Sequence, residues 1–201
     1  MPLNNQLTSY GIKKITATAT AVTYTQGKTG LNATFNGSTS VINTDFNWAP
    51  TTGWSIAAWV KHTADTPNGT IVRANTGQSP IFDFNGTNGA VRCLYYKSNS
   101  ELNRLNTTYI PEKNIWHHYV ALWDGSKIKF YVDGILNATQ DNCTEAPYNG
   151  TSTINIGYYN YSGHMFTGQI ADVRLYNYGL TESEIYELSL GKVGHVMLNC
   201  K

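Results

Sequence analysis

Charged residues are scarce in this sequence, and long apolar runs are missing. Charged side chains make up 13% of the 201 residues, the formal net charge is +1, and Lys and Arg nowhere form a run that could neutralise several phosphates of a nucleic acid. No apolar stretch approaches the roughly 20 residues of a membrane-spanning helix. The opening residues MPLNNQLTSYGIKK also lack the apolar core of a secretory signal. We therefore expect neither nucleic acid nor a membrane among the partners.

Cysteine and clustered metal ligands are scarce as well. The cysteines are far apart and form no C-x-x-C pair: Cys93, Cys143 and Cys200. This number and spacing fit neither a zinc site nor a full disulfide framework, so we expect buried or incidental thiols, with one disulfide as the alternative. Aspartates, whose oxygens suit calcium, are scattered singly: Asp65, Asp83, Asp141 and Asp172. We expect no cofactor and assign no metal ligands, and a structural calcium ion stays open.

The sequence is rich in Asn, Thr, Ser, Gly and Tyr, which suit strands and tight turns better than helices. From Gly27 onward, short apolar runs such as TIVRAN, AVRCLYYK and KIKFYVDG are separated by Asn-Gly, Asp-Gly or other Gly-rich turns. About ten strands at this spacing predict an all-β fold, an antiparallel sandwich or jelly roll. In LTESEIYELSLGK, Thr181 and Glu184 form a capping box, which predicts one short C-terminal helical turn or two.

Residues 1–26 differ from the rest of the chain. In ITATATAVTYT, small apolar residues alternate with threonines at a period of two, which predicts a strand with little side chain to bury. This segment is either the first strand of the domain or an arm that pairs with the sheet edge of a partner. We therefore divide the chain into an N-terminal strand or anchoring arm, residues 1–26, and a domain, residues 27–201.

The segment WHHYVALWDGSKIKFYVDG, residues 116–134, concentrates histidines and aspartates and so resembles a catalytic or metal site. On a strand, however, His117 and His118 point to opposite faces and cannot readily bind one metal. Asp124-Gly125 predicts a hairpin turn between two strands, and Asp133-Gly134 predicts a second turn. We therefore interpret the segment as structural.

Four segments of this chain resemble laminin G-like domains of the concanavalin A-like lectin and glucanase superfamily: GKTGLNATFNGSTSVI, GWSIAAWVK, WHHYVALWDGSKIKFYVDG and FTGQIADVRLYNYGLTESEIYEL. The resemblance covers about Gly27 to Leu190 and implies a jelly-roll sandwich of two antiparallel sheets. Such domains usually begin with an aromatic strand that carries an Asp-Gly turn, and ITATATAVTYT stands in its place. This departure weakens the transfer of a calcium site and leaves Asp172 as a lone candidate ligand.

The resemblance does not determine function, because this fold carries lectins, adhesion modules and some glycosidases. Glycoside hydrolysis needs two carboxyl groups about 5 to 9 Å apart. The triplet Glu182, Glu184 and Glu187 imitates such a set, but it falls in the predicted helix, where Glu184 serves as a capping residue. No G-x-S-x-G motif is present, and Cys93 lies in an apolar strand. We predict that the protein is not an enzyme.

The best candidate for ligand recognition is the segment GYYNYSGHMF, whose tyrosines and amide can stack on sugars and bind their hydroxyls. The predicted ligand-binding residues are Tyr158, Tyr159, Asn160, Tyr161 and His164. The alternative is a tyrosine-rich hairpin that packs on its neighbours or on another subunit. Tyr95 and Tyr96 form a second candidate.

Two functional hypotheses follow. The first is a non-catalytic surface module of a virion, a bacteriophage decoration or fibre protein with a lectin-like fold that binds glycans. The second is an extracellular carbohydrate-binding or adhesion module outside a virion. The expected partners are virion or surface proteins that contact the N-terminal arm, glycans, and a second copy of the chain. The expected location is the virion surface or the extracellular space.

Overall fold

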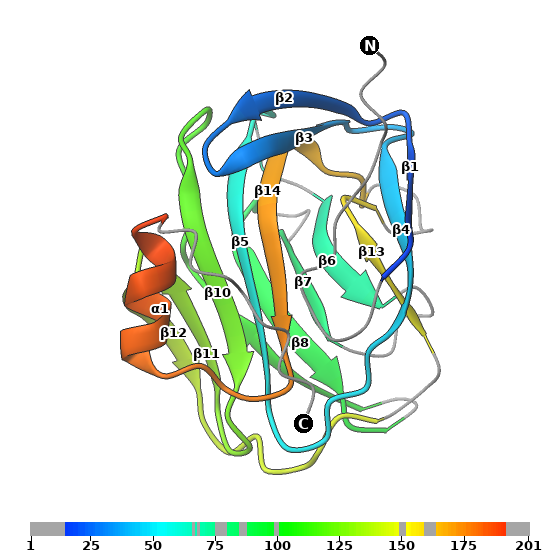
Figure 1. Cartoon of the computed structure of the whole chain (residues 1–201). Helices are drawn as coiled ribbons and strands as arrows, with labels where there is room; N and C mark the ends of the chain where they lie inside the picture. The colour runs from blue at the N-terminus through cyan, green and yellow to red at the C-terminus, as the bar shows by residue number, and fades with distance from the viewer. Residues whose placement is uncertain are drawn as a thin grey trace.

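The computed structural model describes residues 15–65, 67, 69–74, 80–84, 88–98, 101–148, 152–158 and 164–191. Within these residues the chain forms two seven-stranded antiparallel sheets, packed face to face, and one short helix (Figure 1). The all-β jelly-roll sandwich predicted from the sequence is confirmed. No helix among the described residues is long and apolar enough to cross a membrane.

We name the two sheets by their positions in Figure 1. The front sheet has the order β12 (Ile135–Gln140), β11 (Ile128–Val132), β10 (His117–Trp123), β5 (Trp54–His62), β14 (Thr167–Tyr176), β3 (Gly30–Asn36) and β2 (Thr23–Gly27). The back sheet has the order β1 (Ala17–Thr20), β4 (Val41–Asn47), β13 (Thr153–Ile156), β6 (Gly69–Ala74), β7 (Ile81–Phe84), β8 (Val91–Tyr96) and β9 (Leu102–Asn106). The core lies between the sheets.

The core is dominated by aromatic rings that come from both sheets. Trp54 and Tyr95 are both fully buried and meet edge to face, with their ring centroids 6.3 Å apart. Phe82 on the back sheet and Phe130 on the front sheet lie 6.1 Å apart. Such contacts between sheets bury large apolar areas, which is the main driving force for closing a sandwich.

Two of the cysteines belong to this interior. Cys93 and Cys143 are both buried free thiols. Burial disfavours the charged thiolate and raises the pKa of both groups. The prediction of buried thiols is confirmed for these two residues, and Cys200 lies outside the described residues.

The β10–β11 hairpin follows the sequence prediction. Tyr119 points into the core, whereas Val120 on the same strand packs toward the helix, so alternate residues face opposite sides. The Asp124 carboxylate accepts the backbone N–H groups of Ser126 and Lys127 at 3.1 and 2.9 Å, as expected for a residue that closes a turn.

Asp133 does more than close the second turn. It adopts a left-handed backbone conformation with φ of 51°. Its carboxylate accepts the backbone N–H of His118 at 2.8 Å and lies 2.8 Å from Nδ1 of His117. The two histidines are therefore held by one carboxylate although their rings face opposite sides of the sheet.

The N-terminal segment contributes one strand to each sheet. β1 pairs with β4, and β2 pairs with β3, so both strands lie at sheet edges of their own chain. The chain passes from one sheet to the other at Ala21, which has a φ of 50°. Residues 17–27 thus lie within the sandwich.

The helix α1 (Glu182–Ser189) covers part of the outer face of the front sheet (Figure 1). Ile185 is fully buried against Val120, Leu122 and Tyr131. The predicted capping box is present, because the Thr181 hydroxyl accepts the Glu184 N–H at 3.3 Å and the Glu184 carboxylate accepts the Thr181 N–H at 2.8 Å. The sequence prediction of a short C-terminal helix is confirmed.

Thr181→Ala removes the hydroxyl that caps α1 and is expected to lower the free energy of unfolding by about 1 kcal/mol. Chemical denaturation followed by circular dichroism measures the loss. Thr181→Ser keeps the capping oxygen and serves as the control, with little expected change. Equal losses in the two variants would show that the hydroxyl does not stabilise the helix.

Candidate functional site

The structure describes two of the five residues that the sequence predicts to bind ligand. Tyr158 and His164 are both half-buried, whereas Tyr159, Asn160 and Tyr161 lie outside the described residues. The Gly157 N–H donates to the Ile71 carbonyl at 3.2 Å, and the Thr70 N–H donates to the His164 carbonyl at 3.1 Å. Both ends of the segment are thus fastened to β6, and its role in recognition remains a prediction.

A close approach explains the glycine at the start of this segment. Gly157 has a φ of 80°, and a Cβ atom at this position would overlap the ring of Phe35. Only glycine fits both the left-handed backbone and the contact with the ring.

The second predicted pair divides between the core and the surface. Tyr95 is fully buried, and its hydroxyl donates to the carbonyls of Cys143 and Glu145 at 3.2 and 2.8 Å. The prediction that Tyr95 recognises a ligand is therefore wrong, because its ring fills the interior and its hydroxyl anchors a loop. Tyr96 points to the opposite side of β8 and is half-buried.

The outer face of the back sheet carries several polar residues, of which only Asp83 stands out in the sequence, as an isolated aspartate. Strand pairing aligns them in two rows. The first row contains Asn43, Asn155, Arg73, Ile81, Leu94 and Arg104. The second row contains Thr70, Asp83, Arg92 and Asn106. The rows bring together residues that are far apart along the chain.

Asp83 and Arg92 form the central contact of the second row. Arg92 donates from Nε and Nη2 to the two carboxylate oxygens of Asp83, at 2.8 and 2.7 Å. The Asp83 side chain is 0% exposed and that of Arg92 is 19% exposed. The carboxylate beside the guanidinium raises the pKa of Arg92. This two-point contact fixes the orientation of the guanidinium.

Arg92 belongs to a surface that we call the β8–β9 face. Its outward residues are Arg92, Leu94, Tyr96, Leu102, Arg104 and Asn106. Arg104 and Asn106 are exposed, and Arg92 and Tyr96 are half-buried. The face therefore offers two guanidinium groups, an amide and a phenol ring on two paired strands, a rigid support for recognition.

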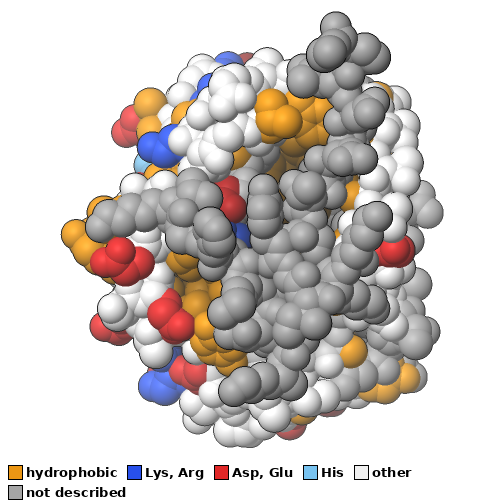
Figure 2. Space-filling view, in the orientation of Figure 1, with side chains coloured by type: hydrophobic (Ala, Val, Ile, Leu, Met, Phe, Trp, Pro, Cys, Tyr) orange, Lys and Arg blue, Asp and Glu red, His pale blue; other side chains and the backbone are white. Residues whose placement is uncertain are grey.

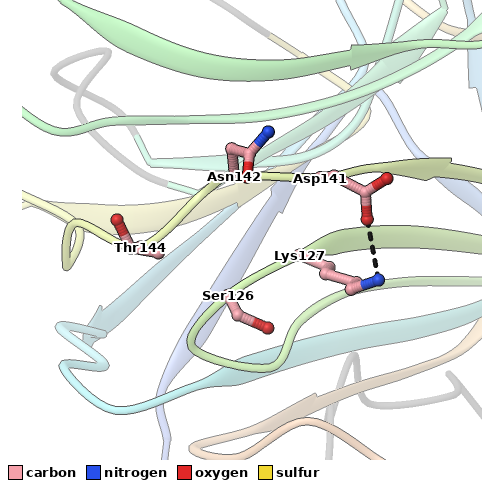
Figure 3. Close-up of a pocket in the computed structure, with 5 residues that line it drawn as sticks. All are labelled: Ser126, Lys127, Asp141, Asn142 and Thr144. Atoms are coloured by element: carbon pink, nitrogen blue, oxygen red, sulfur yellow. Dashed lines mark ion pairs between the residues drawn. The ribbon is translucent and has the colours of Figure 1, made fainter.

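A hollow of about 380 Å³ lies near the β10–β11 turn (Figure 3). The residues that line it all carry polar side chains: Ser126, Lys127, Asp141, Asn142 and Thr144. Lys127 and Asp141 point toward each other and form an ion pair of 2.8 Å. Both side chains are about half exposed, at 47% and 61%, so solvent screens the pair and no buried group orients it. The hollow is less preorganised than the β8–β9 face.

The three glutamates that imitate a hydrolase site all lie on α1. Glu184 caps α1, and Glu182 lies in its first turn. Asp172, the candidate calcium ligand, is bound at both oxygens by Arg174, at 2.7 Å each. Among the described residues, no group of three or more His, Cys, Asp and Glu side chains could hold a metal ion.

The two antiparallel sheets form the jelly-roll sandwich of lectin-like folds. A model of the concanavalin A-like lectin/glucanases superfamily, of the laminin G type, matches residues 34–186. The match covers well over half of the chain, and the chain therefore belongs to this superfamily. The family that the sequence motifs resemble is confirmed.

Solved structures share the fold at low sequence identity. The chain is similar to domain 4 of AbnA, a GH43 extracellular arabinanase from Geobacillus stearothermophilus, in complex with arabinotriose, with a TM-score of 0.71, 20% identity and 88% of each chain covered. It is similar to the binding domain of botulinum neurotoxin serotype G, with a TM-score of 0.73, 13% identity and coverage of 88% of this chain and 46% of that chain. A SAP-like pentraxin from Limulus polyphemus matches with a TM-score of 0.59, 14% identity and coverage of 79% and 81%. The chain spans about half the length of the toxin binding domain, and at these identities the likeness establishes the fold alone.

Proposed function

We propose that this chain is a carbohydrate-binding module that recognises its ligand without cleaving it. The observation that carries the proposal is the likeness to the arabinanase domain solved with arabinotriose, which extends over 88% of both chains. A module that matches a sugar-bound domain almost from end to end has the right size and architecture for the same class of ligand. The superfamily, which also contains glucanases, is compatible with this role.

The β8–β9 face supplies the chemistry for sugar recognition. Guanidinium and amide N–H groups donate to hydroxyl oxygens, and the ring of Tyr96 offers an apolar surface for the C–H side of a pyranose. Asp83 is the only carboxylate in the two rows, and both its oxygens bind Arg92. Hydrolysis of a glycosidic bond needs two carboxyl groups across the bond. The face thus supports binding without hydrolysis.

The N-terminal segment bears on where the protein works. One sequence feature that motivates a virion role is an N-terminal arm, but residues 17–27 pair with strands of their own chain. Pairing within the chain is enough to order residues 17–27 without a partner protein. The virion role remains a prediction. We propose a glycan-binding module that works at a surface or outside the cell, with the virion as one such surface.

A glycan array is expected to show selective binding by the purified protein, and isothermal calorimetry then measures the affinity for the best array ligand. Tyr96→Ala is expected to weaken that affinity about tenfold, because the stacking surface is lost. Tyr186→Ala is the matched control, since Tyr186 lies on α1 and is 55% exposed. Its affinity should be unchanged.

Two further measurements separate the alternatives. His164→Ala tests the segment predicted from the sequence, and a loss of binding in this variant but not in Tyr96→Ala would move the site to that segment. Repeating the array with a chelator tests for a metal requirement. Binding to no glycan would refute the proposed function, and release of shorter sugars from a bound oligosaccharide would refute its non-catalytic nature.

A further inference from the structure

The arginines of this chain are distributed unevenly. The sequence contains four of them: Arg73, Arg92, Arg104 and Arg174. The first three project from the outer face of the back sheet, on β6, β8 and β9. Arg174 lies on β14 in the front sheet, where Asp172 binds it. One sheet face thus holds three quarters of the guanidinium groups of a nearly neutral chain.

Within the two rows, three arginines stand beside a single carboxylate. Asp83 is the only acidic residue in the two rows, and its carboxylate is fully engaged by Arg92. On the face that carries α1, acidic and basic side chains both lie around the helix (Figure 2), and Glu182 and Glu184 stand in its first turn. The two rows therefore hold more arginine than carboxylate, an arrangement that attracts an anion.

Arg92 and Arg104 are placed to act together. Arg92 pairs with Asn106, and Leu94 pairs with Arg104, so the two arginines are diagonal neighbours on adjacent strands. Diagonal neighbours on one sheet face lie within reach of long side chains. Arg73 is buried at 7% exposure, so direct contact with a ligand falls to the other two.

The guanidinium of Arg92 has N–H donors that Asp83 does not use. Of its five N–H groups, Asp83 takes one from Nε and one from Nη2, which leaves three. Arg104 is exposed on the edge strand β9 and has a rotatable side chain. One arginine is thus rigidly oriented and the other is adaptable. Planar donor forks of this kind match the two oxygens of a carboxylate.

We propose that the β8–β9 face selects acidic carbohydrates, and that Arg92 and Arg104 together bind the carboxylate of a uronic or sialic acid residue. This inference rests on the proposed function and names its ligand class. Asn106 and Tyr96 flank the two arginines on the same face and bind the neutral part of the sugar.

A matched pair of ligands tests the charge directly. Calorimetry with trigalacturonate and with its methyl ester compares the same sugar with and without charge, and an array that prints sialylated, uronic, sulfated and neutral glycans identifies the preferred acid. The acidic form is expected to bind at least about tenfold more tightly than the ester, with an affinity that falls as salt is raised. Stronger binding to sulfated than to carboxylated glycans would overturn the assignment of a carboxylate.

Arg104→Gln is expected to weaken binding of the acidic ligand about tenfold and to leave neutral ligands within about twofold. Lys61→Gln removes the same charge from the other sheet and is the control, with affinity for the acidic ligand unchanged. Equal binding of acidic and neutral glycans, or equal affinity of Arg104→Gln and the wild type, would overturn the inference while the proposed function stands. Absence of binding to every glycan would overturn both.

Discussion

Arg92→Met is expected to lower the free energy of unfolding by about 3–5 kcal/mol. The substitution keeps a long side chain on β8 but leaves the Asp83 carboxylate, which is 0% exposed, without its guanidinium partner. An ionised carboxylate without a partner in such a position is among the most destabilising features that a fold can contain. Equilibrium denaturation with urea or guanidinium chloride measures the loss.

The double variant Asp83→Val/Arg92→Met separates the charge from the packing. Replacing both partners of a buried ion pair by apolar residues is often nearly neutral, and valine suits a strand. We therefore expect the double variant to recover most of the stability lost by Arg92→Met. A single variant within about 1 kcal/mol of the wild type would contradict the description of Asp83 as a buried charge that depends on Arg92.

Acidification is expected to destabilise the protein through His118, by about 1.4 kcal/mol per pH unit between pH 6.5 and 4. Burial lowers the pKa of His118 from 6.5 to about 4, an effect that nearby Asp172 opposes and Arg174 reinforces. In this window the unfolded chain binds a proton that the folded protein does not bind. Stability is therefore fully present above pH 6.5 and is lost as the pH falls toward 4.

Denaturation curves at several pH values between about 7 and 4.5 measure this slope. His118→Leu removes the titrating group, and its stability should change much less over the same range. Burial raises the pKa of Asp124, but hydrogen bonds from Lys129 and from the β10–β11 turn outweigh this effect and lower the pKa to about 2. The contribution of Asp124 to stability is therefore lost only below the pH range of this experiment. Parallel slopes for the variant and the wild type would show that His118 does not cause the loss.

Local sequence patterns were sufficient for most of the fold. Short apolar runs between turn residues predicted about ten strands, where the described residues form fourteen. Asp124-Gly125 predicted the turn between β10 and β11, and the Thr181 capping box predicted the start of α1. Each of these features depends on residues that are close in sequence. These features could be predicted because their contacts are local.

The candidate site could not be predicted in the same way. Residues 158–164 form a local sequence cluster of aromatic residues and an amide, and this cluster predicted a site. The arginines of the β8–β9 face are isolated charges in separate apolar strands, so they form no such cluster. A charged residue inside an otherwise buried strand, such as Asp83 in PIFDF or Arg92 in AVRCLYYK, was the available signal. Recognising it as a pair required knowledge that β7 and β8 are neighbours in register.

The sequence by itself determined the class of fold, the main hairpin, the capped helix and the family, because turns, caps and strand periodicity arise from contacts between near neighbours in the chain. The tertiary structure decided that residues 17–27 lie at the edges of both sheets and that Tyr95 is buried and bonded to a loop. It also decided that Arg92 pairs with Asp83 and lies diagonal to Arg104. Register between strands distant in sequence decides which side chains meet, and it follows from closing the whole core.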